Sequence, residues 1–205
     1  MKRILAILFL AIILVAAWWL FFKGDGNTIR NTSEENTALK PKKHSDIFNT
    51  KVDEAVNAYM ILKDAFVNAD SVQARQQSIQ FVTLVDQIPL DELQKDDPQL
   101  AGAAKQQVSD MKANAQPIST DETLNEMRHD FYMVSESLYP FLKTIGYEGP
   151  KLYWQNCPMA FGDDQEANWL STSAQISNPY LGKNHPKYKS SMLRCGEVKD
   201  SISSN

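Results

Sequence analysis

The sequence is poor in the residues that most often carry metal or nucleophilic chemistry. It has two cysteines, Cys157 and Cys195, and three histidines. C-x-x-C and H-x-x-H spacings are both missing, which excludes the common ligand patterns of zinc sites. Phosphate-binding and dinucleotide fingerprints are also missing. No oxyanion-hole motif accompanies either cysteine, so thiolate catalysis with His129 or His185 as the base is disfavoured. We therefore expect a protein that is not an enzyme.

Positive charge is scarce as well. The formal net charge is −4, and Lys2, Arg3 and Lys23 lie at the ends of an apolar block near the N-terminus. The remainder is acidic and has no basic patch of the kind that binds phosphate backbones, so we expect no nucleic-acid partner. The length of 205 residues leaves room for one ordinary domain with accessory segments.

The apolar block, residues 4–22, is the longest uncharged run in the chain. As a helix it spans about 28 Å, close to the hydrocarbon thickness of a bilayer. The positive charges ahead of it favour an N-terminus in the cytoplasm, with the rest of the chain outside. Residues 1–23 are therefore expected to be a membrane anchor. The alternative is a cleaved signal peptide, because Val15-Ala16-Ala17 resembles a cleavage site. Under either alternative the bulk of the chain is extracytoplasmic, that is, periplasmic.

A polar segment and a helical region follow the apolar block. Residues 24–45 are expected to be a flexible linker, because they have too little apolar surface to offset the entropy of ordering. In residues 46–148 apolar side chains recur at helical spacing, which predicts a four-helix up-down bundle. The expected helices cover about residues 46–68, 70–87, 98–114 and 119–145.

Local signals define the faces and ends of these helices. Asp97 before Pro98 suits the start of the third helix, and Gly146 suits the end of the fourth. The run Ser119-Thr120-Asp121-Glu122 resembles a capping box, so the fourth helix is expected to begin there. The buried side of the second helix is expected to include Val72, Ile79, Val82 and Val85.

Residues 149–199 lose the helical periodicity, and residues 200–205 are expected to form a tail. Leu152-Tyr153-Trp154 indicates one short strand, whereas the many turn residues predict an otherwise irregular module. A segment this short is not expected to fold alone, so it should pack on the bundle as part of one composite domain. Arg128 and Ser135, on the fourth helix, are candidates for polar contacts to the module.

Each cysteine of the module lies near a methionine: Met159 follows Cys157 by two residues, and Met192 precedes Cys195 by three. Two cysteines in one secreted domain most often form a disulfide. Thiolate and thioether sulfurs are also soft ligands that select Cu(I), and four of them could converge if the two ends of the module meet. The residues alone leave both alternatives open.

Ordered motifs run through the module: Cys157-Pro158-Met159-Ala160, Trp169-Leu170-Ser171, Asn178-Pro179-Tyr180 with Gly182, and Met192-Leu193 with Cys195-Gly196. In these motifs the chain resembles an uncharacterised bacterial family of domains of unknown function. The family also occurs attached to periplasmic adaptor subunits of heavy-metal efflux systems, so the resemblance implies an envelope protein with a link to copper. Structural roles are expected for Trp169, Asn178, Pro179, Tyr180, Gly182 and Gly196. Residues 183–191, with His185 and Tyr188, depart from the family pattern as a basic insertion.

The sequence thus predicts a mainly α protein: a transmembrane helix, a four-helix bundle and a short Cys/Met module. The leading hypothesis is a non-enzymatic, membrane-anchored envelope protein of heavy-metal homeostasis. It would bind Cu(I) through Cys157, Met159, Met192 and Cys195 and have an envelope or efflux-system protein as its partner. The alternative is an envelope interaction module in which a Cys157–Cys195 disulfide is a staple and no metal binds.

Overall fold

The computed structural model describes residues 44–95 and 97–203. The helices are α2 (Asp46–Asn68), α3 (Ser71–Asp86), α4 (Asp91–Gln94), α5 (Pro98–Ala115), the 3₁₀ helix η1 (Pro117–Ser119) and α6 (Leu124–Ile145). The strands are β1 (Leu152–Cys157), β2 (Ala167–Ser171) and β3 (Glu197–Ile202). The predicted transmembrane helix, residues 4–22, lies outside the described residues, as does most of the predicted linker. In the described part, no helix is both long enough and apolar enough to cross a bilayer.

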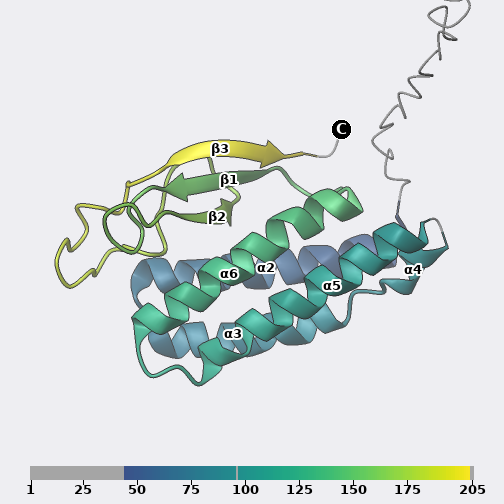
Figure 1. Ribbon diagram of the computed structural model, residues 1–205, viewed down its shortest axis with the longest axis horizontal. Coiled ribbons are helices and arrows are strands. Elements are labelled where there is room, and N and C mark those ends of the chain that lie inside the picture. The colour runs from purple at the N-terminus through teal and green to yellow at the C-terminus, as the bar shows by residue number, and fades with distance from the viewer. Residues whose placement is uncertain (1–43, 96, 204–205) are drawn as a thin grey trace, which may run out of the picture. The chain divides into compact units, whose positions relative to one another are not determined.

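The four long helices α2, α3, α5 and α6 lie side by side, which confirms the predicted set of four (Figure 1). Helix α3 packs against α2 and α5, and α6 packs against α5 and α2. Their inward side chains form one core that continues under the strands. The largest fully buried side chains of the bundle include Tyr59, Phe66, Phe81 and Phe131.

Three of the helices begin at polar caps next to them in the sequence. Ser45 accepts a hydrogen bond from the backbone of α2, Asp70 does so for α3, and Asp97 does so for α5. These caps satisfy backbone N–H groups that have no partner within the helix. The end of the predicted linker is therefore part of the folded domain: Ser45 caps α2, and His44 Nε2 lies 2.6 Å from the carbonyl oxygen of Ile145.

Helix α6 begins later than the sequence indicated. Its cap is Thr123, whose hydroxyl accepts from the Glu126 backbone N–H while the Glu126 carboxylate accepts from the Thr123 N–H. The predicted capping box at residues 119–122 is wrong, because Pro117–Ser119 forms a 3₁₀ turn instead. The end of α6 is confirmed: Gly146 has a left-handed backbone with φ of 66°.

The buried face of α3 is rotated from the predicted one. Val72 and Ile79 are 71% and 58% exposed, whereas Val85 is buried as expected. The buried residues of this helix are Ala74, Ser78, Phe81 and Val85. Small side chains such as those of Ala74 and Ser78 allow a helix to lie close to its neighbours. The buried face of α3 therefore contains smaller and more polar side chains than the predicted face did.

The same substitution on the two faces of α3 should therefore have different effects. Val85→Ala is expected to lower the free energy of unfolding by about 2 kcal/mol, because it removes buried methyl groups and leaves a cavity. Val72→Ala is the matched control and should change it by less than about 0.5 kcal/mol. Chemical denaturation of both variants measures the difference. Equal effects would contradict this orientation of α3.

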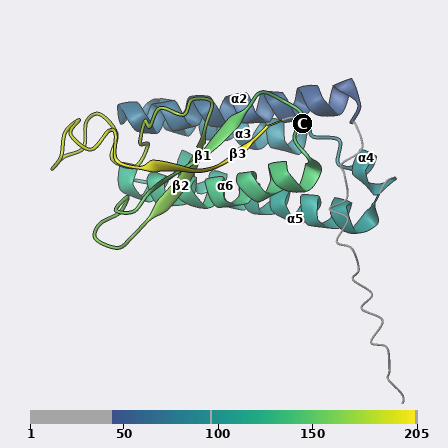
Figure 2. The same cartoon turned by 90° about the horizontal axis from the view of Figure 1, so that it is seen from above.

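The predicted irregular module contains a three-stranded antiparallel sheet, which lies on one side of the bundle in the order β2-β1-β3 (Figure 1). Figure 2 shows the same strands from above, over the helices. The central strand β1 was indicated in part by Leu152-Tyr153-Trp154, but β2 and β3 were not predicted. Strand β3 runs from Glu197 to Ile202, so residues 200–202 of the segment expected to be a tail belong to an edge strand. Tyr139 of α6 stacks on Trp154 of β1 at 4.3 Å between ring centroids, which joins the sheet to the bundle.

Candidate functional site

Cys157 and Cys195 form a disulfide, as one of the two sequence alternatives predicted. Their Cα atoms are 5.7 Å apart, although 38 positions separate them in the sequence. Cys157 is fully buried at the end of β1, and Cys195 lies just before β3. The bond therefore ties together the two ends of the segment between β1 and β3, which contains β2.

The two methionines lie at the surface near this bond. Met159 is 39% exposed, and Met192 is partly buried against the edge of the core. While the cysteines are bonded to each other, neither sulfur is a thiolate that could bind a soft metal. Across residues 44–95 and 97–203, no group of three or more His, Cys, Asp or Glu side chains could hold a metal ion.

Asn178 organises the loop that crosses from the sheet to the bundle. Its Oδ1 accepts from the backbone N–H groups of Tyr180 and Leu181 at 2.8 and 3.0 Å, and its Nδ2 donates to the carbonyl oxygen of Cys195 at 3.0 Å. The asparagine is fully buried, so these bonds satisfy polar atoms that water cannot reach. Tyr180, also buried, donates its hydroxyl to the carbonyl oxygen of Asn168.

The same loop covers the C-terminal end of α2. Lys183 N donates to the carbonyl oxygen of Val67 at 2.8 Å, and Asn184 Nδ2 donates to that of Asn68 at 3.2 Å. Carbonyl groups in the last turn of a helix have no partner within it, so the loop satisfies two of them. Gly182 makes the close approach possible: its φ is 60°, and a Cβ atom there would lie 2.8 Å from the carbonyl oxygen of Val67.

Arg128 reaches this junction from α6. Its Nε donates to the carbonyl oxygen of Pro179 at 3.0 Å, and its Nη2 donates to that of Phe66 at 3.1 Å. The positive guanidinium thus lies at the negative end of the α2 dipole, where a cation is stabilised. The predicted polar contact from Arg128 to the module is present.

Ser135 connects α6 to the sheet through Tyr59 of α2. The Ser135 hydroxyl donates to the carbonyl oxygen of Phe131 at 2.9 Å and lies 2.7 Å from the Tyr59 hydroxyl. The Tyr59 oxygen in turn accepts from the backbone N–H of Leu170 in β2 at 3.1 Å. Burial is the main reason that the pKa of Tyr59 is raised, so the phenol stays protonated.

Trp169 and Gly196 are close neighbours, because a Cβ atom on Gly196 would lie 3.0 Å from a ring atom of Trp169. The Trp169 side chain is fully buried and meets Tyr180 edge to face, with ring centroids 5.9 Å apart. Gly196 has a φ of 135°, and a Cβ atom there would lie 2.5 Å from the carbonyl oxygen of Asn156. Both residues contribute to packing.

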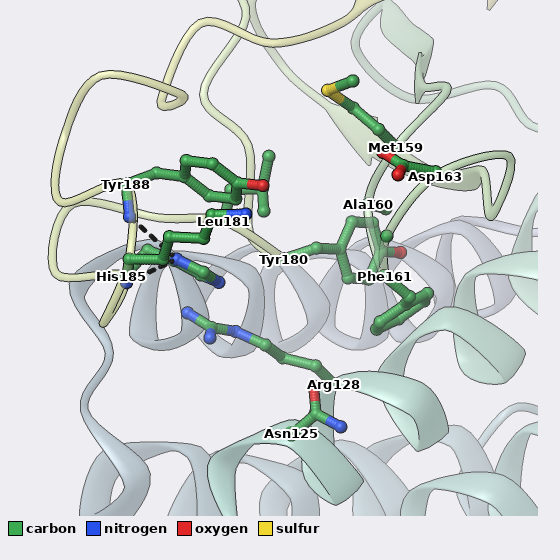
Figure 3. A pocket seen from close by; sticks show the side chains of 12 residues that line it. Asn125, Arg128, Met159, Ala160, Phe161, Asp163, Tyr180, Leu181, His185 and Tyr188 are labelled. Carbon is green, nitrogen blue, oxygen red and sulfur yellow. Dashed lines mark hydrogen bonds between the residues drawn. The ribbon is translucent and has the colours of Figure 1, made fainter.

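A pocket of about 240 Å³ opens beside Arg128 (Figure 3). Asn125 and Arg128 come to it from α6, Phe161 comes from the loop after β1, and His185 and Tyr188 come from the insertion at residues 183–191. The insertion departs from the family pattern, but no site was predicted at it.

Positive charge dominates one side of this pocket. Arg128 is only 5% exposed, and this desolvation lowers its pKa to about 10, so it stays charged at neutral pH. Partial burial, together with the charges of Arg128 and Lys187, lowers the pKa of His185, so its neutral form is favoured. His185 Nδ1 accepts from the backbone N–H groups of Lys187 and Tyr188, both at 3.2 Å. The imidazole therefore holds the shape of the insertion.

Some of these residues were predictable from the sequence and others were not. Arg128 was expected to contact the module, but its place in a pocket was not foreseen. Phe161 and Lys187 were missed as pocket residues. The sequence does contain one signal of a positively charged region: residues 167–196 contain no Asp or Glu, although the chain as a whole is acidic.

Comparison with known proteins relates part of the chain to an uncharacterised family. Residues 55–148 match the model of a family described as protein of unknown function (DUF3347). The match covers the bundle from within α2 to just beyond α6 and ends before β1. Neither a curated protein nor a solved structure matches the chain.

Proposed function

We propose that this protein is a non-enzymatic interaction module of the cell envelope. It is held at the membrane through residues 4–22, and its folded domain lies outside the cytoplasm and docks on another envelope protein. The observation that carries the proposal is the Cys157–Cys195 disulfide. Such bonds persist in oxidising compartments and are rare in the cytosol, which agrees with the apolar N-terminal run.

The use of the polar motif residues supports docking rather than catalysis. Both cysteine sulfurs are bonded to each other, so neither serves as a nucleophile in this form. Asn178 and Tyr180 direct their hydrogen bonds to backbone groups of the module. These buried residues hold the loop at the junction of the bundle and the sheet in one conformation. A preformed surface there would favour binding, because little order is lost on association.

Thiol trapping in acid-quenched cells, with alkylation of the denatured protein, tests the location. Alkylation with a polyethylene-glycol maleimide should leave the untreated full-length protein unlabelled, and reduction before alkylation should add a label to each cysteine. A variant without residues 1–23 should stay in the cytoplasm and be labelled without reduction. Labelling of the full-length protein without reduction would overturn an extracytoplasmic location.

Docking is tested by a photo-crosslinking residue placed at Met159, which lines the pocket beside Arg128 at the junction of the bundle and the sheet. We expect an adduct with an envelope protein from this position. The matched control is the same residue at Val72, which is exposed on α3. Adducts of the same size and yield from both positions would show non-specific collision and would contradict docking at the junction.

A second candidate function is the binding of Cu(I) by the reduced protein. It is favoured by the 5.7 Å separation of the two cysteine Cα atoms, which would let both thiolates approach one ion after reduction. The Met159 thioether, 39% exposed, lies two residues from Cys157 and is accessible as a further soft ligand. Met192 is the fourth donor of this proposed set.

Competition against a Cu(I) chelator tests this candidate. The protein reduced with a phosphine should take copper from the chelator, and the disulfide form should not. Met159→Leu should weaken competition by the reduced protein, whereas Met133→Leu should leave it unchanged. Met133 is a suitable control because it is similarly exposed, at 44%, but lies on α6. Failure of the reduced wild-type protein to compete would exclude the copper function and leave the docking proposal intact.

A further inference from the structure

Arg128 is a buried cation without an acidic partner. Its side chain is almost entirely removed from solvent, with an exposed fraction of 5%. Both of its hydrogen bonds go to neutral carbonyl groups, those of Pro179 and Phe66. No carboxylate forms an ion pair with it among the described residues. A buried charge is costly unless it is paired, so this position favours an anion that comes from outside the chain.

Donors remain available on the guanidinium for such an anion. Nε and Nη2 are used, and Nη1 makes no hydrogen bond to any described residue. The side chain lines the pocket, and Figure 3 shows the guanidinium extending toward His185 across the open space. Arginine N–H groups match the planar oxygens of a carboxylate in direction and spacing.

With Arg128 included, the pocket as a whole carries net positive charge. Lys187 also lines it, and Asp163 is the acidic residue on its wall. With Arg128 charged and His185 favoured in its neutral form, two positive charges face one negative charge. This balance suits a single negative charge better than the double charge of phosphate, which Asp163 would repel.

The walls are suited to an apolar group of modest size. Phe161 and Tyr188 come from different loops, and both line the space. The volume of about 240 Å³ is below the range of drug-sized pockets, which begins at roughly 300 Å³. A ligand with one ring or a short aliphatic chain fits this size.

We propose that this pocket binds a small organic monocarboxylate. The carboxylate contacts Arg128 Nη1 and the Lys187 ammonium, and the apolar part of the ligand lies between Phe161 and Tyr188. This inference is independent of the docking and copper proposals, since it requires neither a partner protein nor free thiols.

Calorimetric titration of the full-length protein in detergent, with phenylacetate as the probe, tests the proposal. Titration into protein-free micelles provides the blank. Phenylacetate should bind, and the uncharged phenylacetamide should bind at least about tenfold more weakly, because a hydrogen bond to a charged group contributes about 1.5–3 kcal/mol. Equal binding of the two, or no binding of phenylacetate, would overturn the proposal.

Two lysine variants test the site without disturbing the buried junction. Lys187→Gln should weaken phenylacetate binding by about twofold to fivefold, as expected for an exposed charge. Lys189→Gln is the matched control, because it removes the same charge from the same loop at a residue that does not line the pocket. Equal loss in both variants would show a general field effect and would overturn the assignment to this pocket.

Arg128→Gln provides the largest expected loss, about tenfold or more. Its thermal unfolding is measured alongside, so that a loss of folding is distinguished from a loss of binding. Inorganic phosphate and a peptide ending in phenylalanine complete the set of probes. Displacement of phenylacetate by phosphate at equal concentration, or binding of the peptide but not of phenylacetate, would overturn the choice of a small monocarboxylate.

Discussion

Replacing both cysteines by serine is expected to lower the free energy of unfolding by about 4 kcal/mol. The Cys157–Cys195 bond closes a loop across 38 positions, and its loss releases this part of the chain in the unfolded state. A decrease of this size is a large share of the stability of a single domain. Chemical denaturation of the full-length protein and of the C157S/C195S variant, followed by circular dichroism, measures it.

A reductant provides the control for this prediction. Reduction should destabilise the wild-type protein by a similar amount and should leave the double variant unchanged. If reduction has no effect on the wild-type protein, the disulfide contributes little and the sheet is held by packing alone. If the double variant is destabilised but reduction has no effect, the serine side chains themselves disturb the site.

Gly196→Ala is expected to lower the free energy of unfolding by about 4 kcal/mol, in two parts. A backbone conformation that only glycine adopts readily accounts for about 1–3 kcal/mol, given the φ of 135°. The rest is steric, because the added Cβ atom would lie 2.5 Å from the carbonyl oxygen of Asn156 in the central strand. Relief of this contact requires backbone movement next to Cys195, so slower disulfide formation is also expected.

Gly162→Ala is a matched control for Gly196→Ala. Gly162 has nearly the same φ, 132°, but no atom lies within 4 Å of the Cβ position there. This variant should carry the backbone cost alone, about 1–3 kcal/mol. Denaturation of both variants separates the two parts, and equal effects would show that the strand at Asn156 yields to the added methyl group.

The parts of the fold that were predictable are those with local signals. Helices α2, α3 and α5 begin at Ser45, Asp70 and Asp97, which are polar caps adjacent in sequence to the residues that they cap. The face of α3 was not predictable from apolar spacing. Its β-branched residues Val72 and Ile79 are exposed to solvent, while the small residues Ala74 and Ser78 are buried.

The sheet was harder to predict because its pairing is not local. Strand β3 pairs with β1 across about 40 residues of intervening chain, which no short window of sequence reveals. Buried polar residues in β1, Gln155 and Asn156, also remove the alternation by which a strand is recognised. The disulfide was predictable as one alternative, because two cysteines in an extracytoplasmic domain most often pair. The pocket was not, because Arg128 and Lys187 meet only after the sheet has packed on the bundle.

The order of the strands has a consequence for how the chain acquires its structure. Strand β3 and Cys195 follow all the helices and the other two strands in the sequence, yet they complete a sheet whose central strand is β1. A chain that is synthesised from its N-terminus can therefore form the helices first, but it cannot close the sheet until β3 has been made. During that interval the apolar surface beneath the sheet, including Tyr139 and Phe131, is unprotected. Factors that shield apolar surface are thus expected to act on this protein until β3 has been synthesised.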